Sequence, residues 1–288
     1  MKRFVKKILF FSSFFCVLFI LYNTLFLGIL LLTDWDFKKR LESLNFVNPD
    51  YELLVLGSSL PEYGIDTEFL TEHLMKSYNL ALHGNPLKTS YVQLNEYLVR
   101  YPKKPKYVIL GLNSFLDEHT DYIHPVVDLT MESHEFVLND IPIISLRWFG
   151  VEFIKKILSS GHRKTKLSFG QVKSPRVNSD KTDYDILNLD LKEFESSYWI
   201  GEIAKLCTQN GIEFIIVEMP GVKGKQNITE IGPHTINFVN GYSALLYNLN
   251  NQEFCSFIDE NKDWVGLSHL NETGALKLTI ELLKILEL

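Results

Sequence analysis

Three short, mostly apolar runs, each leading to a glycine-containing turn, constrain the fold of this chain more than any other feature. They are residues 53–56 before Gly57, residues 106–112, which include Gly111, and residues 212–217, which include Glu213 and precede Pro220-Gly221. An unbroken apolar run of about four to eight residues is typical of a strand buried on both faces, as strands of parallel sheets are. The runs therefore predict a parallel sheet covered by helices.

Stretches with apolar residues at helical spacing separate these runs. The expected helices are residues 66–74, 89–101, 191–209 and 273–288, and two weaker strands are expected at residues 77–82 and 253–258. Strands that alternate with helices favour right-handed crossovers and a parallel sheet between two helical layers. We therefore predict a three-layer α/β/α fold with a central parallel sheet.

The N-terminal segment predicts a membrane anchor. Residues 8–33 carry no charged side chain and exceed the ~20 residues that span a bilayer. Residues 1–7 contain four basic side chains, which by the positive-inside rule places this tail in the cytoplasm. The alternative is a cleaved signal peptide, which has a shorter apolar core and a small-x-small cleavage site. We expect a single-pass anchor in the cytoplasmic (inner) membrane and an extracytoplasmic, periplasmic domain.

The remaining chain is expected to contain a connector and one large domain. Residues 34–50 form a short polar connector, and residues 51–288 form the domain. Within it, residues 116–187 break the alternation of strands and helices and mix histidines, prolines and a basic stretch. We interpret this segment as an insertion that serves as a lid, a substrate platform or a docking surface.

The charge of the domain argues against nucleic acid as a partner. Of 29 basic and 35 acidic residues, seven basic and two acidic ones lie before residue 41, so the rest carries a net charge of about −11. Such a surface repels phosphate backbones. Three histidines of the insertion, His119, His124 and His134, have no metal-ligand spacing and are interpreted as surface or cap residues. We predict no metal and no cofactor.

Four residues at the expected ends of strands and helices suggest serine chemistry. Such chemistry needs a nucleophile, a base within hydrogen-bond reach and donors for an oxyanion. Ser59, after the first strand, is the candidate nucleophile, and His269, before the last helix, is the candidate base. The backbone N–H groups of Ser59 and Gly84 and the amide of Asn113 are the candidate oxyanion hole. Taken singly, a Gly-Ser-Ser after a strand is more often an ordinary turn or a phosphate-binding loop, a lone histidine is more often a capping or packing residue, and Asn113 could simply begin a turn.

Together these stretches resemble the SGNH/GDSL hydrolase superfamily, across residues 51–288 apart from the insertion. The matching stretches are Gly57-Ser58-Ser59, Gly84, Gly111-Leu112-Asn113-Ser114 and His269-Leu270-Asn271. Ser58 replaces the usual Asp of the first block and Ser114 the usual Asp of the third. The resemblance is to the membrane-anchored branch that modifies cell-envelope polysaccharides, and it implies a flavodoxin-like α/β domain.

The sequence departs from this family at the triad acid. Three residues before His269 the family has Asp, and this chain has Gly266. The acid of a Ser-His-Asp triad orients the imidazole and stabilises its charged form. Asp263 is the candidate replacement; a Ser-His dyad with a backbone carbonyl, or a site that binds without turnover, are the alternatives.

The resemblance implies an esterase or O-acyltransferase that acts on acyl esters of a cell-surface glycan, with a multi-span membrane acyltransferase as a partner. The alternative is a catalytically degenerate member that binds glycan or serves as a scaffold subunit of an envelope-modification complex. A third interpretation is a signalling or transport subunit that uses only the anchor. The lipid bilayer, contacted through residues 8–33, is the partner that all three share.

Overall fold

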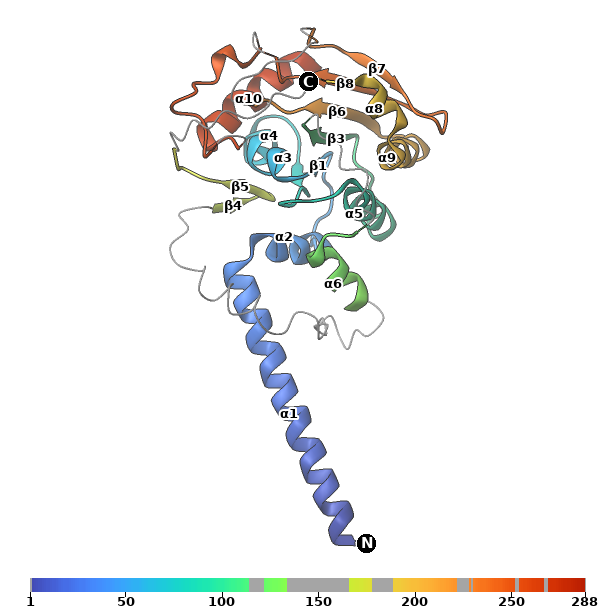
Figure 1. Ribbon diagram of the computed structural model, residues 1–288, viewed down its shortest axis with the longest axis vertical. Helices are drawn as coiled ribbons and strands as arrows, with labels where there is room; N and C mark the ends of the chain where they lie inside the picture. Colours follow the sequence, from blue (N-terminus) through green and yellow to red (C-terminus); the bar gives the residue numbers. More distant parts are fainter. Residues whose placement is uncertain are drawn as a thin grey trace. The chain divides into compact units, whose positions relative to one another are not determined.

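The computed structural model describes residues 2–113, 122–133, 166–177, 189–221, 228, 230–251, 254–266 and 269–287 (Figure 1). The chain divides into two compact units. The first combines the described parts of residues 1–41 and 125–163, and the second those of residues 42–124 and 164–288. The candidate site lies entirely in the second unit, and most of the expected insertion lies outside the described residues.

The first unit begins with one long apolar helix, α1 (Lys2–Thr33). Its part from Lys2 to Tyr22 is long and apolar enough to cross a membrane, and none of that part is buried. Length and composition fit a membrane anchor or a signal sequence equally. Two shorter helices, α2 (Trp35–Leu44) and α6 (Pro125–Ser133), are joined by a hydrogen bond of 2.8 Å from Arg40 Nε to Thr130 Oγ1.

The second unit is an α/β domain around a six-stranded sheet of order β2-β1-β3-β6-β8-β7. Its strands are β1 (Leu53–Gly57), β2 (Ser77–Asn79), β3 (Tyr107–Leu112), β6 (Glu213–Glu218), β7 (His234–Asn237) and β8 (Ser243–Asn248). Five strands run parallel, and β7 pairs antiparallel with β8 at one edge. The predicted α/β fold is confirmed, with a mixed, mostly parallel sheet.

Helices connect the strands, and a separate hairpin precedes the last third of the chain. The helices are α3 (Ser59–Gly64), α4 (Thr67–His73), α5 (Leu87–Arg100), α8 (Leu191–Ser196), α9 (Tyr198–Gln209) and α10 (Glu272–Leu286). The hairpin consists of β4 (Lys166–Ser168) and β5 (Gln171–Lys173). Short connections keep each helix against the strands that it joins.

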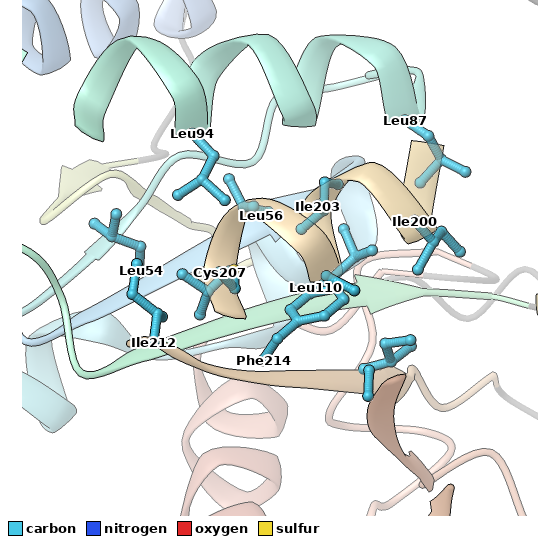
Figure 2. Packing of buried hydrophobic residues seen from close by; sticks show 14 of the residues in the cluster. Leu54, Leu56, Leu87, Leu94, Leu110, Ile200, Ile203, Cys207, Ile212 and Phe214 are labelled. Atoms are coloured by element: carbon cyan, nitrogen blue, oxygen red, sulfur yellow. The ribbon is translucent and has the colours of Figure 1, made fainter. Parts of the chain in front are cut away.

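Alternate residues of each strand feed two apolar layers, one on each face of the sheet. On one face, Leu54, Leu110 and Phe214 pack with α5 and α9 (Figure 2). On the other face, Val55, Ile109 and Val217 belong to a cluster with residues of α4 and α10. Because both faces are covered, the strands read as unbroken apolar runs, which is the pattern visible in the sequence.

Three local features differ from the sequence-based expectations. The strand expected at residues 253–258 is wrong: Phe254–Phe257 form a 3₁₀ turn, η3. The helix expected over residues 191–209 is divided into α8 and α9 at Ser197, whose hydroxyl accepts a hydrogen bond from Ile200 N and caps α9. The strands β7 and β8 were not expected: β7 has no continuous apolar run, and the apolar residues 244–247 of β8 were not interpreted as a strand.

A core truncation is expected to destabilise the second unit. Leu110 is fully buried in the α5–α9 layer, so Leu110→Ala should lower the free energy of unfolding by about 2–5 kcal/mol. Urea unfolding of the detergent-solubilised chain, followed by tryptophan fluorescence, measures this change. Val99→Ala is the matched control, because Val99 is 80% exposed and its loss should change stability by less than about 0.5 kcal/mol. Equal effects of the two variants would contradict the assigned core.

Candidate active site

Two glycines at the carboxyl ends of β1 and β3 let the helix α3 lie against the sheet. Gly57 and Gly111 are paired in register. A Cβ at Gly57 would lie 2.3 Å from Gly111 O, and a Cβ at Gly111 would lie 2.6 Å from Pro61 Cβ. Gly57 also has φ +127°, a region that disfavours side chains. Glycine at both positions therefore places the start of α3, with Ser59, directly above the strand ends.

The predicted nucleophile and the predicted base are hydrogen-bonded. Ser59 Oγ and His269 Nε2 lie 2.8 Å apart, although the two residues are 210 positions apart in the chain. Ser59 is half-buried. With the imidazole proton on Nδ1, the Ser59 hydroxyl donates to Nε2, which is the arrangement that general-base activation of a serine needs.

The loop that carries His269 is fixed by backbone hydrogen bonds and by the cap of α10. Val265 N donates to His269 O at 2.8 Å, and Asn271 N donates to Asp263 O at 2.9 Å. The Asn271 side chain accepts from Thr273 N and Gly274 N and thereby caps α10. An asparagine cap typically stabilises a helix by about 1 kcal/mol. The cap therefore also fixes the residue two positions before it, His269.

Asp263 is buried beside this loop and bonds to a lysine. Its Oδ2 accepts from Lys277 Nζ at 2.6 Å and from Asp259 N at 2.7 Å. These bonds close the turn from Asp259 to Asp263, so Asp263 has a structural role, and its role as triad acid stays a prediction. Gly266, at the family's acid position, has open space where a Cβ would project.

The predicted oxyanion donors come from neighbouring strand ends. Gly84 has φ +68°, and its neighbour Asn85 donates from Nδ2 to Gly57 O at 3.2 Å. Asn113 is half-buried two residues beyond Gly111, as Ser59 is two residues beyond Gly57. The sheet register thus brings the segments of Ser59, Gly84 and Asn113 to one edge, and the use of their donors for an oxyanion stays a prediction.

The β4–β5 hairpin joins the nucleophile side of the site to the histidine side. Gln171 is fully buried, and its Nε2 donates to Tyr63 O of α3 at 3.2 Å. Ser174 O accepts from Glu272 N at 3.0 Å, at the start of α10. Phe169 O accepts from Asn79 N of β2 at 2.9 Å. The hairpin is the returning limb of the expected insertion, so part of that segment supports the site directly.

Two aromatic residues that the sequence did not single out flank His269. The ring centroids of Tyr63 and His269 lie 5.1 Å apart, and those of His83 and His269 lie 6.2 Å apart. Burial, and second the neighbouring His83, lower the pKa of His269 below its usual 6.5. The imidazole is therefore neutral at pH 7, as a general base must be. In the sequence, only their positions could have indicated that these two residues belong to the site: His83 precedes Gly84, and Tyr63 follows Ser59 by one helical turn.

The described residues contain no group of three or more His, Cys, Asp or Glu side chains placed to hold a metal ion. His124 is buried rather than on the surface, and its Nε2 lies 3.1 Å from His83 O. His119 and His134 lie outside the described residues. Cys207 and Cys255, the two cysteines that follow the apolar N-terminal segment, are both free thiols.

Comparison with known proteins adds no family assignment. No protein-family model, no curated protein and no solved structure matches this chain significantly. The α/β fold with its mostly parallel six-stranded sheet is the part of the expected likeness that is established.

The lowered pKa of His269 can be measured directly. An NMR titration of the imidazole should give a midpoint below 6.5, because burial and a second imidazole both disfavour the charged form. His83→Gln should raise this midpoint by removing the neighbouring imidazole, and His73→Gln, at an exposed position, is the matched control. A midpoint of 6.5 or above in the unaltered chain would contradict the assigned environment.

Proposed function

We propose that this protein is a membrane-anchored serine esterase or O-acyltransferase of SGNH-like type that acts on acyl esters of a cell-surface glycan. The observation that carries the proposal is the 2.8 Å hydrogen bond between Ser59 Oγ and His269 Nε2 at the carboxyl edge of the sheet. Ligands of open α/β sheets bind at this edge. The half-buried Ser59 and a neutral His269 suit nucleophilic attack.

The proposed reaction proceeds in two balanced halves. His269 Nε2 takes the proton of Ser59, Oγ bonds to the acyl carbon, and the imidazolium returns the proton to the departing alcohol as its C–O bond breaks. Water, or a hydroxyl of an acceptor glycan, then gives its proton to His269 and attacks the acyl carbon. The Oγ–acyl bond breaks and Ser59 regains its proton. The N–H groups of Ser59 and Gly84 and the amide of Asn113 would stabilise the oxyanion in both halves.

The setting of the reaction follows from the N-terminal helix. In this proposal residues 8–33 of α1 stay in the membrane as an uncleaved anchor, with residues 1–7 in the cytoplasm and the second unit in the periplasm. A multi-span acyltransferase that delivers acyl groups across the membrane is the proposed partner. An acidic chain beyond residue 40, with a net charge of about −11, fits a neutral or cationic glycan better than nucleic acid.

A second candidate function is a subunit that binds a glycan ester, or serves as a scaffold, without turnover. Two observations favour it: Gly266 has no carboxylate, and the carboxylate of Asp263 is bonded to Lys277. A triad that loses its acid loses up to ~10⁴ in rate. The two candidate functions therefore share one fold and differ in whether Ser59 reacts with an ester. A test of the chemical reactivity of Ser59 distinguishes them.

Covalent labelling of Ser59 tests the proposal. The full chain in detergent is treated with a fluorophosphonate, and peptide mass spectrometry locates the modified residue. Ser59 should be modified, and His269→Ala should slow the labelling by about a hundredfold or more, because general-base catalysis contributes about 10²–10⁴. Ser58→Ala is the matched control, since Ser58 is the adjacent serine and should not affect labelling at Ser59. A folded chain without labelling would support the binding role.

A new carboxylate at position 266 should accelerate the reaction. Gly266→Asp meets no neighbouring atom at Cβ, and it restores the acid at the family's position, so the labelling rate should rise about tenfold or more. Gly266→Asn, of the same size but uncharged, is the control and should not increase the rate. No gain in the aspartate variant would indicate that His269 is already oriented by another group.

A further inference from the structure

The segment that carries Gly84, one of the predicted oxyanion donors, is a tight turn. Asn85 N donates to Leu82 O at 3.2 Å, which closes a four-residue turn with His83 and Gly84 at its centre. Gly84 has φ +68°, and the φ of His83 is negative. This combination is that of a type II turn, in which the third residue needs a positive φ and is therefore usually glycine.

The peptide group between His83 and Gly84 is the central peptide of this turn. It supplies both the carbonyl oxygen of His83 and the N–H of Gly84. Because the peptide is trans and planar, these two groups point in opposite directions. Turns of types I and II differ mainly by a reversal of the central peptide. A bond that holds His83 O therefore also sets the direction of the Gly84 N–H.

His124 makes such a bond. Its Nε2 lies 3.1 Å from His83 O, and since a carbonyl oxygen only accepts, Nε2 carries the proton that is donated. His124 is itself buried and fixed, because its backbone N donates to Thr89 Oγ1 at 2.8 Å. Thr89 is fully buried in the first turn of α5. The donor to His83 O is therefore held by the start of a helix and does not sample the rotamers of a surface side chain.

Two further bonds attach the ends of the turn to the sheet. Gly57 O, at the end of β1, accepts from Leu82 N and from Asn85 Nδ2, each at 3.2 Å. These bonds keep the turn beside the segment that carries Ser59. Neither of them involves the central peptide, so they fix where the turn lies and not which way that peptide faces. The bond from His124 acts on the central peptide itself.

We propose that His124 is a positioning residue of the predicted oxyanion hole, whose hydrogen bond to His83 O directs the Gly84 N–H toward the reacting oxygen. The inference rests on the proposed serine chemistry and deepens it. The bond also polarises the peptide, which strengthens its N–H as a donor. Removing an oxyanion donor costs about 10²–10³ in rate. Loss of the orienting bond should cost less, about tenfold, which is the most that one neutral hydrogen bond typically contributes.

Two variants of similar side-chain length separate this hydrogen bond from the packing of the imidazole ring. His124→Gln keeps an N–H that can reach His83 O, whereas His124→Met has no donor. Both lose the ring, so a role in packing alone would affect them alike. Fluorophosphonate labelling of Ser59 in the full chain should slow about tenfold in the Met variant and by less than about threefold in the Gln variant. His234→Met is the control, because His234 Nε2 also lies near a carbonyl, Glu230 O at 3.3 Å, but on the distant edge strand β7.

The peptide itself can be observed by NMR. His83–Gly84 is the only place in the sequence where glycine follows histidine. A chain with ¹³C-carbonyl histidine and ¹⁵N-glycine therefore gives a single signal in a spectrum that selects bonded ¹³C–¹⁵N pairs. The ¹³C resonance of His83 should move to lower frequency in the His124→Met variant, because the bond to its oxygen is lost, and should stay in place in the Gln variant. Phosphonylation of Ser59 should move the Gly84 amide proton to higher frequency, because the N–H then donates to the phosphoryl oxygen.

Equal labelling rates in the Gln and Met variants would overturn the role of His124 and leave the proposed function intact. A Gly84 amide proton that does not move when Ser59 is phosphonylated would do the same. This second measurement needs only the unaltered chain, so it applies even where the Met variant does not fold. A folded, unaltered chain that is not labelled at Ser59 would instead overturn the proposed function, and the inference about His124 with it.

Discussion

The close contact of α3 with the ends of β1 and β3 is the constraint on which the site depends. Gly57 and Gly111 face each other in adjacent strands, and Pro61 fills the space that their side chains would occupy. Any side chain at either position would push α3 away from the sheet. Ser59 would then move with the helix and lose the 2.8 Å approach to His269. The packing of α3 against two strands thus determines the distance between Ser59 and His269.

The second half of the pair is held by independent means. His269 is positioned by the turn from Asp259 to Asp263 and by Asn271, which caps α10. The β4–β5 hairpin connects the halves, since Gln171 bonds to α3 and Ser174 to the start of α10. The expected insertion, which interrupts the alternation of strands and helices, therefore supplies contacts to α3 and α10 that the core of strands and helices does not.

The sequence predicted the parts of this molecule that follow from local pattern. Runs that are buried on both faces, such as residues 53–56, are recognisable because both faces demand apolar residues. The candidate site was found because a strand end and a helix start each place a polar residue at a defined point. The edge strand β7 was missed, because its half-exposed residues lack that pattern, and the inner strand β8 was missed although its residues 244–247 are apolar. His83 was missed because its contact with His269 joins residues far apart in the chain.

The group that partners the predicted base, His269, determines how large a rate enhancement the proposed site could give. A carboxylate beside an imidazole favours the charged form and raises its pKa, whereas burial and a second imidazole lower it. The structure places His269 under the latter two influences. Such a histidine is available as a neutral base over a wide range of pH, but the imidazolium formed during attack on an ester is costly beside His83. In the proposed reaction, transition-state stabilisation would then come mainly from the predicted oxyanion donors at Ser59, Gly84 and Asn113. If the proposed function holds, an acceptor held close to the acyl group would contribute to the rate through proximity as well.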